Sequence, residues 1–598
     1  NVVFGRGDFV LRNTPYAGLR SIIASLLGIG YQESDTIPEK SYEDLIARFG
    51  DRACLLNIVL NTNIPDSEEI RTLTGAQRVQ ATQDLLLRLI DDEARKKPII
   101  IIIDEARWID ESTAKLLECV KENIANSLII LSFQVTEGLP LVQGLKRLDA
   151  ETITLKELKD SELETLICAK LGVRSISRDL AEVVFRISKG NPFFCIELTG
   201  SLMDQELLLF ANNNCSLVKD TAIKDFSLPE TVRGAIRQRI DRMGQGSQLS
   251  LKVGSVVGNR FAEKIISSIY PIRSERNSVP TYLRESEQFG FLNETVVDNM
   301  NGYLFSTATT VEVAYEMTLA EQRRQLHLEC AEWYENNFTD NLQPFFVRLA
   351  NHWNEANVKE KAAAYYEREA IRLFQSGFVK EALNVGLEGI RLLGQEIPRD
   401  LPSIGQKIGE NMGAIGAMMQ GKTIESLIDH KKLEDPKKEK VIKMLLSMGP
   451  FAHQSQQGEL FALMTIICQR LTLEYGNGES AAEVYAMYSI IYKALSKDAQ
   501  GAYTWSNLSL AIDKNNGYTL QSRVLFIHGW FIALWIVPIE ELIPLACKGA
   551  DAGFKTGDIL FACFNLSLVA ILKSTCGKNL NDVIKTSTEH FIRNNNAV

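Results

Sequence analysis

The sequence predicts a parallel α/β layer over residues 1–150 and a mostly α-helical chain after it. Residues 99–103 are five consecutive isoleucines, and residues 127–133 (SLIILSF) form a second apolar run. A run that is apolar at every position is typical of a strand covered on both faces, as in the middle of a parallel sheet. Residues 112–126 separate the two runs and are long enough for one crossover helix. We therefore expect two parallel strands with both faces buried.

The first residues of the chain add to this layer. Residues 2–4 read as the end of another strand, followed by a turn at residues 5–8 (GRGD). A helix is expected to begin near Pro15, because proline is favoured in the first turn of a helix. Beyond Leu155 the pattern reads as helical.

Residues 227–320 change in character from their surroundings. We expect three short helices and then one hairpin. The helices are placed at 229–243, 248–257 and 279–287, and the strands at 290–295 and 302–306. Helices followed by one hairpin indicate a winged-helix-like domain. That fold often binds DNA, but the acidic balance of this chain favours a regulatory use.

No convincing strand follows the hairpin. Residues 358–393 combine small and large apolar residues at the spacing of tetratricopeptide-like helical hairpins, so residues 321–395 are predicted to form such hairpins. Less regular hairpins continue the pattern, and residues 396–598 are predicted to be an α-helical repeat region. Residues 396–403, with two prolines, read as a linker.

Composition excludes several classes of protein. The 598 residues include 65 Lys and Arg against 75 Asp and Glu, a formal charge of −10, which argues against general nucleic-acid binding. The apolar stretch 524–537 is shorter than the roughly 20 residues of a membrane span, so we expect a buried helix there and no membrane insertion. Ten cysteines without a CxxC pair fit a reducing compartment, and we expect a cytoplasmic protein. The six histidines show no metal-ligand spacing.

The strongest chemical signal is the pair Asp104-Glu105, which directly follows the isoleucine strand. Nucleotide sites lie at the carboxyl ends of parallel strands, and an apolar strand ending in Asp-Glu is the Walker B pattern. In that setting Asp104 holds Mg²⁺ through water, and Glu105 orients and activates the water that attacks the γ-phosphate of ATP. The plainer alternative is an acidic helix cap after a core strand.

The residues after this strand resemble a known family. DEARWIDESTAKLL is similar to the DExxWxDxxSxxLL stretch of the predicted signalling ATPases related to AAA+ and STAND NTPases, with an Orc1-like AAA ATPase domain. Further similar stretches follow in the family's order. They are NTPY (13–16), GNPFF (190–194), LPETVRGAIRQRID (228–241), EVAYE (312–316) and RRQLH (323–327). Stretches at 471–491 and 550–564 look like the helical region of large proteins that also carry Ser/Thr-kinase, histidine-kinase or nucleotide-cyclase domains.

This resemblance implies a domain order and a site. Residues 1–150 are expected to be a partial P-loop NTPase core, residues 151–226 a helical lid, and residues 227–320 the winged helix. Gly190, Asn191 and Pro192 match the GxP motif of the lid, which in the family lies against the adenine. ATP and Mg²⁺ are the implied cofactors. Trp108 is expected either to pack the loop beneath the site or to be a plain core residue.

Three departures from the family weaken the expectation of ATP turnover. The family's P-loop precedes the segment that resembles residues 2–8, so this chain is expected to lack it. Gln134 stands after the second strand, where relatives often carry an Arg that senses the γ-phosphate, and an amide brings no positive charge. Thr307 replaces the His of an FRH-like motif.

One further match to a phosphate-binding pattern is interpreted differently. GAMMQGKT (416–423) fits GxxxxGK[ST], but it follows the Walker B strand and has no strand before it. Phosphate binding by this pattern needs a strand, a loop and a helix in that order. We therefore interpret residues 416–423 as a helix end and a turn.

Two main functions are consistent with the sequence. The first is a regulatory and interaction segment of a multidomain signal-transduction protein, which binds protein partners through its helical repeats. The alternative is an ATP-binding, slowly hydrolysing Mg-ATPase switch whose P-loop lies upstream. A minor alternative is a DNA-binding regulator acting through the winged helix. ATP or ADP is the expected small ligand, neither nucleic acid nor membrane is expected as a partner, and oligomerisation is left open.

Overall fold

The computed structural model describes residues 1–29, 40–134, 148, 150–218, 231–298, 300–585 and 588. These residues are mostly helical, and their strands form three small sheets of three strands each. The chain divides into two compact units, Asn1–Tyr365 and Tyr366–Val598. The division falls inside the range 321–395 that the sequence predicts as one block, and the finer domain boundaries stay predictions.

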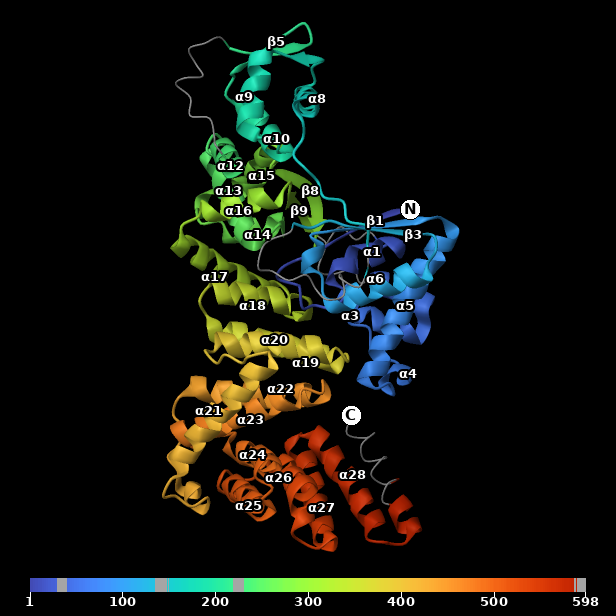
Figure 1. Cartoon of the computed structure of the whole chain (residues 1–598), viewed down its shortest axis with the longest axis vertical. Helices are drawn as coiled ribbons and strands as arrows, with labels where there is room; N and C mark the ends of the chain where they lie inside the picture. The colour runs from blue at the N-terminus through green and yellow to red at the C-terminus, as the bar shows by residue number, and fades with distance from the viewer. Residues whose placement is uncertain are drawn as a thin grey trace. The chain divides into compact units, whose positions relative to one another are not determined.

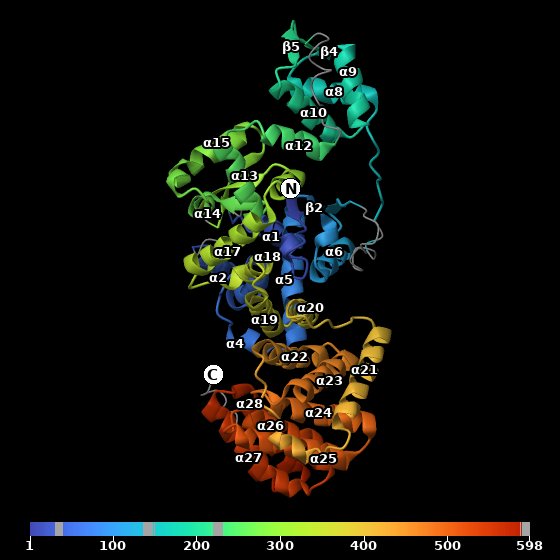
Figure 2. The same ribbon diagram turned by 90° about the vertical axis from the view of Figure 1, so that its left-hand side faces the viewer.

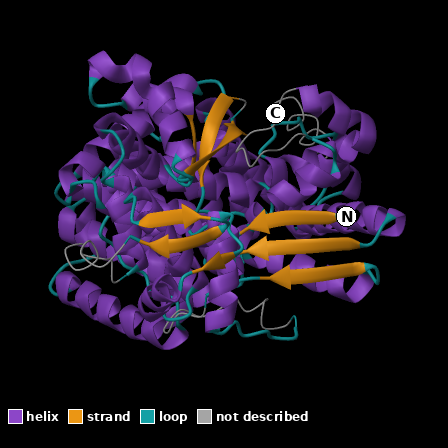
Figure 3. Ribbon diagram, turned by 90° about the horizontal axis from the view of Figure 1, so that it is seen from above, coloured by secondary structure: helices purple, strands orange, loops and turns teal. Residues whose placement is uncertain are grey.

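The predicted parallel layer is present near the N-terminus. Its strands are β1 (Val2–Arg6), β2 (Ile99–Asp104) and β3 (Ser127–Leu131), hydrogen-bonded in the order β1-β2-β3 with all strands parallel. Figure 3 shows the three arrows running in one direction. The register places Arg6 beside Asp104 and Ile103 beside Leu131, so the carboxyl ends of the strands meet at one edge.

Helices cover one face of this sheet, and Figure 1 shows α1, α5 and α6 together on one side of the strands. The helices of the layer are α1 (Arg20–Leu26), α2 (Lys40–Phe49), α3 (Asn57–Leu60), α4 (Glu68–Arg71), α5 (Gly75–Lys96) and α6 (Glu111–Asn123). Right-handed crossovers that add strands in one direction all lie on the same face. The order β1-β2-β3 therefore accounts for the one-sided covering.

Among the described residues the other face of the sheet is exposed at β1 and β3 and half-buried at β2, so the prediction that both faces are buried is wrong. Ile101 and Ile103 are fully buried on the helix side. On the opposite side, Phe4 of β1 is 63% exposed, and Leu128 and Ile130 of β3 are 53% and 43% exposed. A strand's own sequence shows that both of its faces are apolar, but it does not show which neighbours cover them.

Residues 150–218 form a small α/β domain rather than a purely helical lid. The helices are α8 (Asp160–Leu171), α9 (Arg178–Ser188) and α10 (Pro192–Asp204), and the strands are β4 (Ser175–Ile176), β5 (Leu208–Ala211) and β6 (Asn214–Leu217). A shared core that includes Leu163, Leu180 and Leu198 joins the helices. The three strands escaped prediction because each is at most four residues long.

The expected helices and hairpin follow. The elements are α12 (Val232–Ile240), α13 (Gln245–Val257), β7 (Arg260–Ala262), α14 (Glu263–Ile269), α15 (Val279–Gln288), β8 (Leu292–Val297), β9 (Met300–Phe305), α16 (Ala308–Glu316) and α17 (Ala320–Asn337). The hairpin strands β8 and β9 pair antiparallel, and β7 adds a third strand beside β9. Arg233 forms ion pairs with Glu312 and Glu316, which ties the LPETVRGAIRQRID and EVAYE stretches together.

A helical array makes up the rest of the chain, as predicted (Figure 2). After α18 (Phe346–Glu355) come α19 (Lys359–Gln375), α20 (Val379–Leu392), α21 (Leu401–Met419), α22 (Pro436–Gln454), α23 (Gly458–Tyr475), α24 (Ala481–Ser496), α25 (Ala499–Asn515), α26 (Gln521–Ile527), α27 (Ile539–Thr556) and α28 (Ile559–Thr575). Some consecutive helices pack together, for example α24 with α25 and α27 with α28, whereas α20 packs against α22 and α21 against α23. The expected linker at 396–403 is shorter than predicted, because α21 begins at Leu401.

The apolar stretch 524–537 is not one buried helix, so that prediction is wrong. The helix α26 ends at Ile527 and continues as a π-helical turn, η7 (His528–Ile532), and a 3-10 turn, η8 (Ala533–Trp535). This change in winding brings Trp535, 69% exposed, to the surface. No helix among the described residues is long and apolar enough to span a bilayer.

A buried ion-pair cluster connects α10 to the following domain. Arg239 of α12 donates to Glu197 at 2.8 Å and to Asp204 at 3.1 Å, and both acidic residues belong to α10. It also donates to the carbonyl of Phe289 at 2.6 Å, and the side chain of Arg239 is only 11% exposed.

We expect Arg239→Leu to lower the free energy of unfolding by about 3 kcal/mol, because it leaves two nearly buried carboxylates without their cation. The matched control is Arg178→Leu, whose pair with Glu182 is largely exposed and whose loss should cost less than about 0.5 kcal/mol. Urea unfolding followed by circular dichroism measures both. Equal midpoints for the two variants would contradict this account.

Candidate nucleotide site at the strand ends

The carboxyl edge of the parallel sheet brings three polar side chains together. Asp104 ends β2, and its carboxylate accepts a hydrogen bond from the hydroxyl of Ser132, just beyond β3. The guanidinium of Arg6, at the end of β1, lies 4.0 Å from the same carboxylate. Asp104 is 61% exposed, so its remaining lone pairs face solvent. Sequence analysis missed Arg6 and Ser132, although both stand where their strands end.

The backbone at Glu105 is held in an uncommon conformation. Glu105 has a φ of +50°, in the left-handed region that non-glycine residues seldom adopt. Its carbonyl accepts from the amide of Trp108 at 3.0 Å, which closes a tight turn after the strand. A Cβ atom at Gly7 would lie 2.2 Å from this same carbonyl oxygen, so the turn needs glycine at position 7. Such conformations cluster at functional sites, where surrounding contacts hold them.

Trp108 packs beneath this turn. Its ring meets the ring of Phe9 edge-on, with 4.9 Å between the centroids, and the guanidinium of Arg107 lies 5.0 Å from its centroid. Phe9 follows β1 and Arg107 follows β2, so both contacts join the segments after these strands, and the role of Trp108 at the site stays a prediction. Gln134 is exposed, three residues beyond the end of β3.

Asp110 has a structural role that joins two of the family-like stretches. Its carboxylate caps α6 by accepting from the amide of Thr113 at 2.8 Å, and it also accepts from the amide of Tyr16 at 3.0 Å. Tyr16 ends the NTPY stretch and has a φ of +58°. Asp110 is only 2% exposed, so both hydrogen bonds are shielded from water. The third acidic position of the DExxWxD pattern thus acts as a helix cap.

The donor atoms at this edge suit a magnesium ion. Mg²⁺ prefers oxygen ligands and usually keeps several waters, so one or two carboxylates suffice on the protein side. Asp104 and Glu105 offer such oxygens, and Ser132 adds a hydroxyl. The ion would supply charge neutralisation for phosphate oxygens. The hydrogen bond from Ser132 holds the carboxylate of Asp104 in one orientation.

Gly190, Asn191 and Pro192 lie in the α8–α10 domain and start α10. Gly190 has a φ of +81°, and a Cβ atom there would lie 2.6 Å from the Cβ of Glu157. Asn191 caps α10 by accepting from the amide of Phe194 at 2.8 Å, and Pro192 occupies the first turn. The described contacts of this motif are therefore those of a turn and a helix start, and its contact with adenine stays a prediction.

The second phosphate-like pattern lies at a helix end, as the sequence indicates. Residues up to Met419 belong to α21, so their amides are engaged in the helix, and no strand precedes them. Gly421 has a φ of +75°, and the amide of Lys422 donates to the carbonyl of Met419 at 2.9 Å. In this geometry these backbone amides are not free to bind a phosphate.

A buried cluster in the α17–α18 hairpin was not foreseen. His327 and His352 share a hydrogen bond of 2.8 Å between their Nδ1 atoms, Tyr315 Oη lies 3.1 Å from His327 Nε2, and Cys330 Sγ lies 3.3 Å from His352 Nε2. One N–H on each neutral ring satisfies this whole chain of hydrogen bonds. No group of three or more His, Cys, Asp or Glu in the described part of the chain is arranged to hold a metal ion. The sequence feature that could have predicted this cluster is the three-residue spacing of His327 and Cys330, which places both on one face of a helix.

Burial keeps both histidines neutral. It lowers the pKa of His327 to about 4, with help from the charge of Arg323. Burial, and then the nearby His327 and Arg348, hold the pKa of His352 well below its usual value. Burial also raises the pKa of the Cys330 thiol.

Comparisons with known proteins give partial matches. Residues 159–216 match a family described as a domain of unknown function, DUF8739, and this range includes Gly190 to Pro192. The chain is similar to adenylate cyclase type 10 of Mus musculus, with 21% identity over 407 residues, covering 53% of this chain and 25% of that protein. The Homo sapiens protein of the same name is 20% identical over 369 residues, with 48% and 23% covered.

Two further similarities were found, one in sequence and one in structure. An uncharacterised protein of Rhizobium meliloti (strain 1021) is 24% identical over 277 residues, covering 43% of this chain and 25% of that protein. A Pyrococcus horikoshii signal transduction ATPase with numerous domains (STAND) and a tetratricopeptide repeat sensor aligns in structure over 98% of this chain and 86% of its own, with a TM-score of 0.34 and 12% identity. The chain spans about a quarter of the length of the curated relatives it matches.

The neutral histidine pair predicts a loss of stability in mild acid. Both rings are neutral in the folded protein, whereas the unfolded chain binds protons below a pKa of about 6.5. The stability that they contribute is therefore complete above pH 6.5 and falls as the pH drops toward the folded-state pKa of about 4 for His327. Between pH 6.5 and 5 this costs about 2 kcal/mol for His327, and His352 adds to the loss in the same direction.

Urea unfolding at pH 7, 6 and 5 measures the effect. His327→Gln should lose less stability between pH 7 and 5 than the unchanged protein, because one titrating group is removed. The exposed His453, replaced by Gln, serves as the control for the loss of a histidine outside the cluster. The same pH dependence in the protein and in His327→Gln would show that the rings are not held neutral.

Proposed function

We propose that this chain is the regulatory segment of a multidomain signal-transduction protein, in which an ATPase-like α/β layer is joined to a helical array that binds protein partners. The observation that carries the proposal is the arrangement of Asp104, Ser132 and Arg6 at the carboxyl ends of three parallel strands. Nucleotide sites occupy this position in α/β sheets. The similarity to a quarter of the length of adenylate cyclase type 10 supports a segment that works with a catalytic domain elsewhere.

The chemistry proposed at the strand ends is that of an ATP switch. Asp104 would hold Mg²⁺ through water, and Glu105 would orient the water that attacks the γ-phosphate. Arg6 offers a positive charge near Asp104, whereas Gln134 offers only a neutral amide beyond β3. We expect binding to matter more than turnover, since a slow hydrolysis step suffices to reset a switch.

Two features of the sheet support a nucleotide site completed by a further strand and helix. In the described sheet β3 is an edge strand, so its outer backbone groups have no partner strand. The face that carries Phe4, Leu128 and Ile130 is exposed. A strand that pairs with β3 and connects back to β1 would need a crossover on this open face, because the direction of strand addition reverses. Such a reversal is where ligands bind in open α/β sheets.

The test compares this chain with a longer protein that includes the upstream phosphate-binding loop. We expect calorimetry to detect weak or no Mg-ATP binding by residues 1–598, because the loop and its lysine supply much of the triphosphate contact. In the longer protein, Asp104→Asn and Glu105→Gln should each slow ATP hydrolysis by about tenfold or more. Micromolar affinity in residues 1–598 would contradict the first expectation.

Lys422→Ala is the matched control for these variants. It removes the lysine of the helix-end GKT sequence and should leave the ATP affinity of the longer protein unchanged. A clear loss of affinity would place a phosphate contact there. If the longer protein binds no nucleotide at all, the strand-end site is not a nucleotide site and the proposal loses the observation that carries it.

A further inference from the structure

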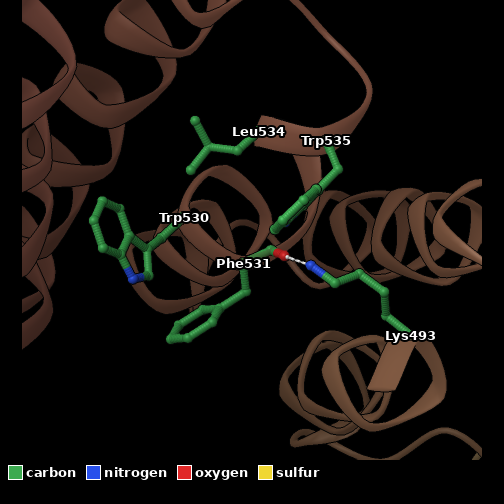
Figure 4. A pocket seen from close by; sticks show the side chains of 5 residues that line it. All are labelled: Lys493, Trp530, Phe531, Leu534 and Trp535. Atoms are coloured by element: carbon green, nitrogen blue, oxygen red, sulfur yellow. Dashed lines mark hydrogen bonds between the residues drawn. The ribbon is translucent and has the colours of Figure 1, made fainter. Parts of the chain in front are cut away.

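The turn where the 524–537 stretch unwinds builds an aromatic pocket. Trp530 and Phe531 come from η7, Leu534 and Trp535 from η8, and Lys493 reaches in from α24 (Figure 4). The cavity measures about 390 Å³. Ligand pockets in proteins begin at about 300 Å³, so this one has room for a single large side chain or ring. π-Helical turns are rare and are frequently found at functional sites.

Lys493 gives the pocket a charge. Its ammonium group donates to the carbonyl of Phe531 at 2.7 Å and lies 4.4 Å from the centroid of the Trp535 ring. An ammonium has three N–H groups, and this hydrogen bond uses one of them. No carboxylate among the described residues forms an ion pair with Lys493, and partial burial lowers its pKa. Among the described residues the cation is thus held against the ring of Trp535 without an ion-pair partner.

Exposed aromatic residues continue from the pocket across the array. The ring of Phe531 lies 6.1 Å from that of Phe526, and Phe526 lies 5.3 Å from Phe564 of α28. Phe531 and Phe564 are 37% and 41% exposed. A ligand anchored in the pocket therefore finds further apolar surface beside it, which a free small molecule would leave uncovered.

We propose that this pocket binds the C-terminal residue of a partner protein that ends in an apolar side chain. The carboxylate pairs with the ammonium of Lys493, and the side chain enters among Trp530, Leu534 and Trp535. A terminal residue fits because its carboxylate and its side chain leave the same Cα atom, which matches the short distance between the ammonium and the Trp535 ring. The residues before it lie on Phe531, Phe526 and Phe564.

This inference rests on the proposed partner-binding role of the array, but not on the nucleotide site. The test therefore uses residues 1–598 without nucleotide, so its failure leaves the ATP experiments unaffected. The probe is the peptide acetyl-Gly-Ser-Leu-Leu-Phe with a free carboxylate, compared by calorimetry with the same peptide as the C-terminal amide. We expect the carboxylate form to bind at least about tenfold more tightly, because only it pairs with Lys493.

Variants separate charge from apolar contact. Lys493→Gln should abolish the preference for the carboxylate form, and Trp535→Ala should weaken both forms. Lys514→Gln, at an exposed lysine elsewhere in the array, should keep the tenfold preference. Circular dichroism confirms that each variant is folded.

Three results would overturn the proposal. Equal binding of the two peptide forms, or no binding of either, would show that no terminal carboxylate is recognised. An unchanged preference in Lys493→Gln would place the charge recognition elsewhere. N-acetylphenylalanine tests whether a small molecule suffices as the ligand. If it binds as tightly as the peptide, the pocket recognises a free apolar acid and not a protein terminus.

Discussion

The α/β layer depends on one buried carboxylate. Asp110 starts α6, the helix that carries the chain from β2 to β3, and it also holds the amide of Tyr16 in the loop after β1. The same side chain therefore fixes the helix after the Asp104-Glu105 pair and the loop from the neighbouring strand. Because Asp110 is almost fully buried, water cannot replace either hydrogen bond without exposing the core.

Sequence reasoning found the elements whose signal is local. The isoleucine run identifies β2, SLIILSF identifies β3, and the hairpin β8–β9 follows from its turn residues. The position of Asp104 at the end of a buried strand also follows from the sequence, since a strand's end is visible in its own residues. The end of α21 also follows from the sequence: residues 416–423 match a phosphate-loop pattern but were predicted to be a helix end and a turn.

The features that escaped prediction depend on residues far apart in the chain. The open face of the sheet reflects which strands lie beside β1 and β3, and the register that places Arg6 beside Asp104 is a property of the pair. The contact between His327 and His352 joins two helices through residues that lie 25 positions apart in the sequence. At His528 the helix changes to a π-helical turn, so an apolar stretch that resembles a core helix becomes a surface turn. The periodicity of the sequence does not indicate this change.

The exposed edge of β3 also affects how readily the protein aggregates in solution. SLIILSF combines high β-propensity with no charge, and in the described sheet it is an edge strand with Leu128 and Ile130 exposed. Such segments pair with copies of themselves and seed aggregates. Residues 1–598 prepared alone should accumulate strand-mediated oligomers as their concentration rises. A peptide or protein segment that pairs with this edge of β3 would reduce the aggregation.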